Sequence, residues 1–291
     1  MDFYNGQALL DLCEKEHIKI SAAMKEREVT MGALTTEEVD TKLKTVLEIM
    51  RNSSHRPIEH PGKSIGGLIG GEAKLVNDHR ETSQSIAGSM LSKAMAYSMA
   101  VLEVNASMGL IVAAPTAGSS GVLPGILMAL QEEKNLSDDA LYEGLLNASA
   151  IGYILMRNAS VSGAEAGCQA EVGAASAMAA SAIVEMMGGT PSQCLSAAVH
   201  AMSNLLGLVC DPIAGLVEAP CQTRNAIGVA NAITSAELAL AGVNHPIPFD
   251  EMAEAMYRVG KSLPFELRET AMGGCAGTPT GCGLGCSICG K

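Results

Sequence analysis

The sequence predicts an all-α protein, a compact helical domain in which Gly-rich loops surround a buried site. The first observation is that 48% of the 291 residues are hydrophobic while only 3% are aromatic, with no Trp. Such a core must be built from Ala, Leu, Ile, Val and Met, whereas sandwiches and barrels favour β-branched and aromatic residues. The second is that no alternating pattern of convincing length indicates a strand.

Apolar spacing together with start and stop signals predicts the helices along the chain. A first helix is expected over residues 6–20, and a second begins at Thr36 and runs to about Met50. The polar stretch 51–71 contains His, Pro and Gly residues and is expected to be a loop. Further helices are expected over 83–108, 124–133, 138–156, 165–187, 191–208, 222–241 and 250–261, and a Gly/Cys-rich tail occupies 272–291.

The formal net charge is −12, and most of this charge lies in the middle of the chain. Residues 101–240 hold twelve Asp or Glu but only three Lys or Arg. Because nucleic acids and anionic membrane surfaces are bound by clustered basic residues, both classes of partner are disfavoured. No secretory signal and no long apolar span is recognised. We therefore expect a cytoplasmic chain whose thiols stay reduced.

Nine cysteines in such a chain favour metal binding or redox chemistry over a disulfide framework. The densest group lies in the tail, where Gly residues would let the backbone wrap around a metal centre. A frayed terminus with exposed thiols is the alternative interpretation. The tail cysteines are Cys275, Cys282, Cys286 and Cys289.

A second group of cysteines lies at predicted helix ends. Cys168 is at the front of a helix, Cys210 follows a helix end, and Cys221 opens a helix after Pro220. Cysteines at helix N-termini have a lowered thiol pKa, and thiolates are the ligands that iron requires. Packing of all three in the core is the alternative. Cys13 and Cys194 lie inside predicted helices, where packing is the better interpretation.

Two loops are candidates for anion binding. Residues 114–121 place small and hydroxyl side chains at a helix entry, where backbone N–H groups can bind an anion, although a helix-capping turn is the alternative. The Gly-rich stretch 61–71 presents Lys63 beside Ser64 and could hold a carboxylate, or could be a solvated linker. No arrangement of His with Ser, Cys or Asp indicates nucleophilic catalysis.

Four segments in order resemble the catalytic (α) chain of bacterial iron–sulfur L-serine dehydratases. They are residues 115–118 (PTAG), 163–171 (GAEAGCQAE), 210–218 (CDPIAGLVE) and 220–225 (PCQTRN), within a likeness that extends from about Lys63 to Gly274. On this interpretation the chain has an N-terminal helical segment (1–60), a catalytic helical domain (61–274) and a tail (275–291). The length is similar to that of the two-chain form, which implies a separate β chain.

The resemblance implies a [4Fe–4S] cluster that is held by Cys168, Cys210 and Cys221 and leaves one iron open to L-serine. Water would be eliminated to give pyruvate and ammonia without pyridoxal phosphate. The general base is not identified and could lie on the β chain, and the tail cysteines have no assigned role. Alternatives are a related lyase such as an L-cysteine desulfhydrase, or an iron–sulfur carrier. The expected substrate-binding residues are Lys63, Ser64, Thr116, Gly118, Ser119 and Ser120.

Overall fold

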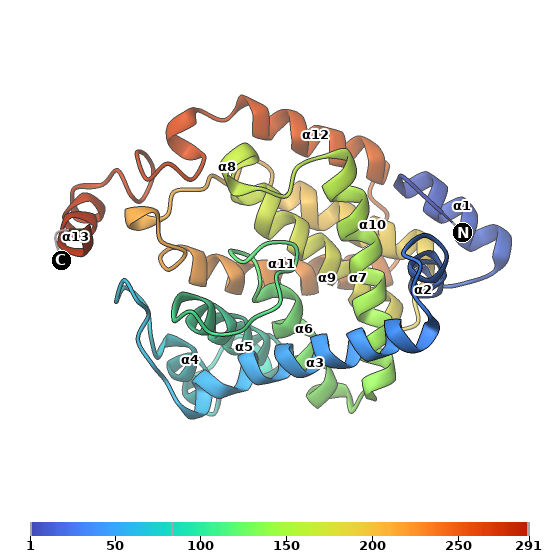
Figure 1. Ribbon diagram of the computed structural model, residues 1–291, viewed down its shortest axis with the longest axis horizontal. Helices are drawn as coiled ribbons and strands as arrows, with labels where there is room; N and C mark the ends of the chain where they lie inside the picture. The colour runs from blue at the N-terminus through green and yellow to red at the C-terminus, as the bar shows by residue number, and fades with distance from the viewer. Residues whose placement is uncertain (1, 83, 290–291) are drawn as a thin grey trace.

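A computed structural model describes residues 2–82 and 84–289, the last of them by its backbone only. These residues form α-helices, two 3₁₀ turns and one π turn, and no strand, so the predicted all-α class is confirmed (Figure 1). The elements are α1 (Gly6–Glu16), α2 (Ile20–Met31), α3 (Thr36–Glu59), α4 (Glu72–Arg80), α5 (Gly88–Ala106), α6 (Val122–Lys134), α7 (Asp138–Asn158), α8 (Gly163–Ala166), η1 (π, Gln169–Gly173), α9 (Ala174–Met186), α10 (Pro191–Asn204), η2 (3₁₀, Ile213–Gly215), α11 (Cys221–Leu240), α12 (Phe249–Ser262), η3 (3₁₀, Phe265–Leu267) and α13 (Pro279–Cys289).

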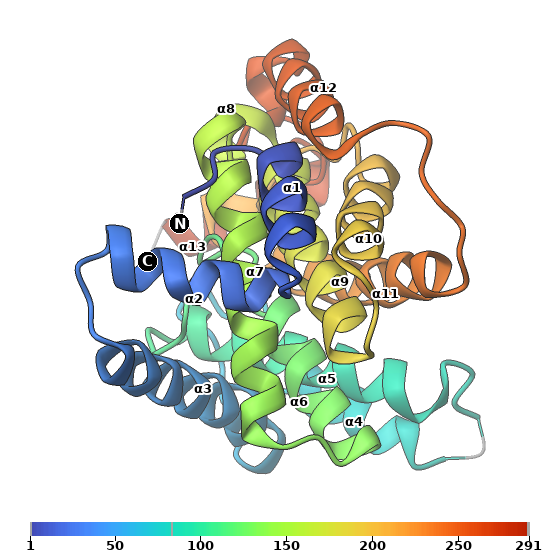
Figure 2. The same cartoon turned by 90° about the vertical axis from the view of Figure 1, so that its right-hand side faces the viewer.

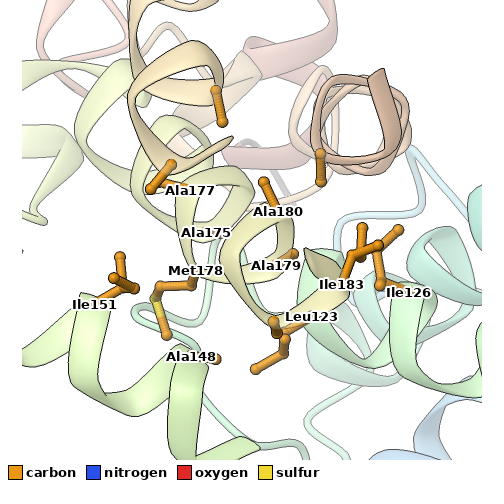
Figure 3. Packing of buried hydrophobic residues seen from close by; sticks show 14 of the residues in the cluster. Leu123, Ile126, Ala148, Ile151, Ala175, Ala177, Met178, Ala179, Ala180 and Ile183 are labelled. Atoms are coloured by element: carbon orange, nitrogen blue, oxygen red, sulfur yellow. The ribbon is translucent and has the colours of Figure 1, made fainter. Parts of the chain in front are cut away.

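Helix α9 is the centre of the core. All its residues from Ala174 to Glu185 are buried, as expected of a helix that is apolar on every side. It packs against α6, α7, α10 and α11, and Figure 3 shows Met178 beside Ile151 and Ile183 beside Ile126, along with the alanines of α9. Small residues let these helices approach closely, which explains how a core with so few aromatic residues is filled.

The N-terminal helices pack on the same core. Helices α1 and α2 lie against α7, α10 and α12 (Figure 2). The Asp250 carboxylate at the start of α12 accepts hydrogen bonds from the backbone N–H groups of Gly6 and Gln7, at 2.6 and 3.0 Å. This contact satisfies donors that the first turn of α1 leaves free. The proposed division at residues 60/61 and 274/275 stays a prediction.

Three predictions for the first third of the chain are wrong. The helix expected over 6–20 is two helices, because His17 adopts a left-handed conformation (φ 55°) and ends α1. The loop expected from residue 51 begins only after Glu59, since α3 continues through Pro57. Helix α4 was not predicted. The helix expected from Ser83 begins at Gly88, and Ser83 lies outside the described residues.

The expected helix 165–187 is also divided. A short α8 ends at Gly167, and the π turn follows before α9 begins. Part of the Gly/Cys-rich tail is helical, over α13, and residues 290–291 lie outside the described residues. In the described part of the chain, no helix combines the length and apolar character that a membrane span requires.

Candidate metal centre

Cys168, Glu171 and Cys210 come together on one side of the core. Their ligand atoms, two sulfurs and one carboxylate oxygen, all lie within 4.8 Å of one another. Both thiols are 2% exposed, and the Glu171 side chain is partly buried. The grouping therefore joins segments that are about forty residues apart in the sequence. It brings together ligand atoms of the kinds that bind metals, which a metal site requires.

The π turn positions Cys168 beside the segment that carries Cys210. Gly167 has φ 76°, and a Cβ atom there would lie 2.7 Å from the Leu208 carbonyl oxygen, so only glycine fits. The backbone N–H of Gln169 donates to that same carbonyl at 2.9 Å. π turns are frequent at functional sites, and this one contains Glu171, whose carboxylate lies near the thiol of Cys168.

Cys210 is fixed by its backbone. Its N–H donates to the carbonyl of Leu267 at 2.9 Å, and its carbonyl accepts from the N–H of Glu269 at 2.7 Å. These two bonds form an isolated bridge outside any sheet. The loop after α12 thus holds Cys210 in place.

Cys221 is the first residue of α11 and is buried, but among the described residues it does not belong to the group of ligand atoms that Cys168, Glu171 and Cys210 form. Its carbonyl accepts from Nδ2 of Asn225, which also donates to the carbonyl of Gly118, at 2.9 and 2.8 Å. The Asn225 side-chain oxygen accepts from the N–H of Gly121 at 3.0 Å. One amide therefore ties the loop 118–121 to the helix that begins with Cys221.

The three thiols differ in their electrostatic surroundings. A hydrogen bond from the Cys210 thiol lowers the pKa of Cys168, against the effect of burial and with the help of Arg224, whose Nη1 lies 3.5 Å from the sulfur. The same shared proton, together with burial, raises the pKa of Cys210. Burial raises the pKa of Cys221, so the prediction that its helix N-terminus lowers this pKa is wrong.

Glu171 is a site residue to which the sequence assigned no role. Burial raises its pKa to about 7, although the hydroxyl of Thr116 donates to Oε1 at 2.7 Å and opposes the shift. Its Oε2 lies 4.0 Å from the sulfur of Cys210. The only signal in the sequence is its position three residues after Cys168, in a segment with few other polar side chains.

Thr116 and Gly118 lie at the site, as their loop reaches Glu171. A Cβ atom at Gly118 would be 3.2 Å from Oε1 of Glu171. The hydroxyl of Ser119 lies 3.1 Å from that of Thr116, and the hydroxyl of Ser120 donates to the Ala117 carbonyl. The backbone N–H groups of Gly118 and Ser119 have no acceptor among the described residues. They are therefore available to an anion.

Ser64 and Lys63 have different surroundings. The Glu218 carboxylate, 3% exposed, accepts from the hydroxyl of Ser64 at 2.6 Å and from the N–H groups of Gly66 and Leu68. Glu218 lies three residues before Cys221 in the sequence, so this contact ties the loop to the segment that leads into α11. Lys63 instead lines a separate cavity of about 220 Å³ between the ends of α3 and α5. The hydroxyl of Ser64 thus already has an acceptor.

The tail lies beside the site without joining the thiol group. The N–H of Cys275 donates to Oδ2 of Asp211 at 2.6 Å, and α13 packs against η2. Cys275, Cys282 and Cys286 are exposed, as the alternative of exposed thiols predicts. The side chain of Cys289 lies outside the described residues.

Cys13 and Cys194 are buried, which confirms their interpretation as packing residues. Burial raises the pKa of Cys13 to about 12 and also raises that of Cys194. Neither thiol is among the side chains that could share a metal ion.

The residues present fit an iron–sulfur group. Cys168 and Cys210 bring two buried, unpaired thiols together, and thiolates are the ligands that iron–sulfur clusters use. Arg224 contributes a positive charge that favours the ionised form of Cys168. Gly163 leaves space, because a Cβ there would lie 2.5 Å from Oε2 of Glu171 and 3.0 Å from the sulfur of Cys210.

Comparisons with known proteins relate the chain to serine dehydratases. A family model described as serine dehydratase alpha chain matches residues 15–276. The L-serine dehydratase alpha chain of Peptoniphilus asaccharolyticus is 48% identical over 276 residues, which cover 95% of this chain and 94% of that protein. A probable L-serine dehydratase alpha chain of Bacillus subtilis is 44% identical over 279 residues, 96% and 93% of the two chains. The L-serine dehydratase of Helicobacter pylori is 37% identical over 284 residues, 95% of this chain but 62% of that protein.

Proposed function

The chain belongs to the serine dehydratase alpha chain family, and we propose that it is the catalytic subunit of an L-serine dehydratase, a lyase that forms pyruvate and ammonia. The observation that carries the proposal is the convergence of two thiols and a carboxylate within 4.8 Å, in a chain similar to dehydratase alpha chains over nearly its whole length. The expected cytoplasmic location stays a prediction.

Cys168, Cys210 and Cys221 are the proposed ligands of a [4Fe–4S] cluster. Their burial, their free state and the positive charge of Arg224 support this assignment. When bound, such a cluster supplies a Lewis-acidic iron that makes the serine hydroxyl a better leaving group. The proposal requires no pyridoxal phosphate.

The loop 116–119 is the proposed site for the substrate carboxylate. The N–H groups of Gly118 and Ser119 are free to donate, and N–H groups ahead of a helix bind anions well. Thr116 fixes Oε1 of Glu171, so that Oε2 remains directed toward the thiols and can attract the substrate ammonium. Lys63, Ser64 and Ser120 stay predictions. Ser64 and Ser120 would act by shaping their loops, since their hydroxyls already have acceptors.

The acceptor of the Cα proton is proposed to lie on a separate β chain. In the part of the chain that the structure describes, no His is among the side chains grouped at the metal centre. A site completed by a second chain would form pyruvate slowly, or not at all, with this chain alone.

An anaerobic reconstitution tests the proposed function. The chain is treated with ferrous iron and sulfide, and pyruvate is measured from L-serine, L-threonine and L-cysteine, with and without the β chain. Faster turnover of L-serine is expected. Preferential turnover of L-cysteine would instead indicate a desulfhydrase. Retention of iron and sulfide without any pyruvate, with the β chain present, would favour an iron–sulfur carrier.

A further inference from the structure

Residues 110–113 lie outside any helix, and their backbone has no hydrogen-bond partner among the described residues. The segment lies between α5 and α6, outside any helix (Figure 1). None of its four N–H groups donates to a described residue, and none of its four carbonyls accepts from one. Unpaired backbone of this kind is a template for pairing with another strand.

The sequence of this segment favours a strand in a chain that is otherwise helical. Leu-Ile-Val-Ala combines two β-branched residues with Leu, and such runs are typical of strands. Leu110 is 71% exposed and Met108 just before it is 81% exposed, while Val112 packs against the core. Val112 thus holds the segment against the core, while the apolar side chains of Leu110 and Met108 are exposed to solvent.

Two cavities near the segment are lined by the cations Arg56 and Lys63, and the smaller one is also lined by the buried carboxylate of Glu103. Leu110 and Arg56 line a cavity of about 430 Å³ on the face of α3. Arg56, His60 and Lys63 line the neighbouring cavity of about 220 Å³. None of these three side chains forms an ion pair with a described residue, although the chain has 31 acidic residues and 19 Lys or Arg. A partner with acidic side chains would complement this surface.

We propose that residues 110–113 pair with an edge strand of the β chain, whose acidic side chains face Arg56, His60 and Lys63. The inference rests on the proposed function, since it identifies where the second chain of that enzyme binds. Strand addition to exposed backbone is a common mode of recognition, with backbone hydrogen bonds providing affinity.

Two observations favour the β chain over a second copy. The Helicobacter pylori relative, a single L-serine dehydratase chain, has more than a third of its length outside the part that this chain matches. A separate chain can supply that region here. Pairing two copies of the segment would instead bring two sets of basic residues together, and like charges oppose such an interface.

The position of the segment connects the partner to catalysis. Only Ala114 and Pro115 separate it from Thr116, whose hydroxyl contacts Glu171. A strand bound at residues 110–113 would therefore lie at the entrance to the loop proposed to hold the substrate. This arrangement allows the partner to place its own residues in the site.

Hydrogen exchange on the full chain, alone and in a complex with its β chain, tests the inference. We expect the peptide containing residues 109–114 to exchange at least about tenfold more slowly in the complex. We expect Leu110→Pro or Ile111→Pro, each of which removes one N–H, to weaken binding about tenfold. The matched variants Leu110→Ala and Ile111→Ala should weaken it less, because they keep the N–H. Both positions are needed, since only alternate residues of a strand bond to one neighbour.

Three results would overturn the inference. They are a complex that forms without protection of residues 109–114, protection that accompanies self-association of the chain alone, and failure of the two chains to associate. Iron and sulfide content of the chain alone is measured in parallel. A chain that fails the binding test but retains the cluster at Cys168, Cys210 and Cys221 leaves the proposed metal centre standing.

Discussion

The Nη1 atom of Arg224 lies 3.5 Å from the sulfur of Cys168. The same guanidinium donates to the carbonyl of Val209 at 2.8 Å, and Nη2 pairs with Oδ1 of Asp211 at 2.6 Å. Arg224 also lies one turn after Cys221 on α11. A single side chain thus joins the three cysteine-bearing segments, and Asp211 extends the connection to the tail.

Replacing Arg224 should weaken the whole centre. Arg224→Met leaves Asp211 buried without its partner, and loss of one member of a buried ion pair costs about 3–5 kcal/mol of unfolding free energy. Adding Asp211→Asn should recover part of this loss, because it removes the stranded charge. Chemical unfolding of the single and double variants measures the coupling. Independent, additive effects would show that the pair is not a unit.

Each of the three proposed ligands should be indispensable for iron. Cys168→Ala, Cys210→Ala and Cys221→Ala are each expected to abolish cluster absorbance and to reduce iron and sulfide to background after anaerobic reconstitution. Cys194→Ala is the matched control, because this thiol is also buried but has Asn147, Ser181 and Cys13 as its neighbours. If all three variants kept the cluster and pyruvate formation, the ligand assignment would be wrong.

Space at Gly163 should be required for the centre. A methyl group there would meet Oε2 of Glu171 at 2.5 Å and the sulfur of Cys210 at 3.0 Å, so Gly163→Ala is expected to displace both. Overpacking of this kind costs about 1–3 kcal/mol and should lower iron retention. Gly62→Ala is the control, since nothing lies within 4 Å of its added Cβ. Equal iron content in the two variants would contradict the prediction.

The hydroxyl of Thr116 should matter more than its methyl group. Thr116→Val removes the hydrogen bond to Oε1 of Glu171 and should reduce kcat/KM for L-serine by about 10–100-fold, the usual effect of removing a support of a metal site. Thr116→Ser keeps the hydroxyl and should retain most activity. Iron content should change little in either variant. A Ser variant as slow as the Val variant would rule out this role.

A partly exposed network away from the metal centre should make stability depend on pH. Burial alone would raise the pKa of Glu132, but hydrogen bonds from His55, Lys93 and Tyr97 outweigh it and lower this pKa. Because the folded-state pKa is depressed, its stabilisation is complete above the unfolded value of about 4.3. It is lost as pH falls through the folded value.

Glu132→Gln is therefore expected to cost about 1–2 kcal/mol at neutral pH, a value reduced for partial exposure, and progressively less in acid. Thermal unfolding between neutral and acidic pH measures the difference. Glu237→Gln, on the exposed side of α11, is the control and should behave like the parent chain. A difference that stays constant with pH would contradict the assignment.

Local patterns identified most helices, but they failed where backbone geometry depends on distant contacts. The continuation of α3 through Pro57 buries Pro57 on a face that has tertiary partners. The first residue of the π turn, Gln169, donates its N–H to the carbonyl of Leu208, about forty residues away. Neither feature is visible in apolar periodicity, since both involve contacts with other segments.

The sequence by itself determined the all-α class, through its small and aliphatic residues, and it indicated the family through four motifs in order. It did not determine which polar residues meet at the site. Glu171 became significant only when folding placed its carboxylate beside Cys210 and Thr116. The partnerless backbone of residues 110–113 is likewise a property of the folded chain. The chemistry of each side chain can be read from the sequence. Distances, burial and unmet hydrogen bonds instead depend on packing between segments that are far apart in the sequence.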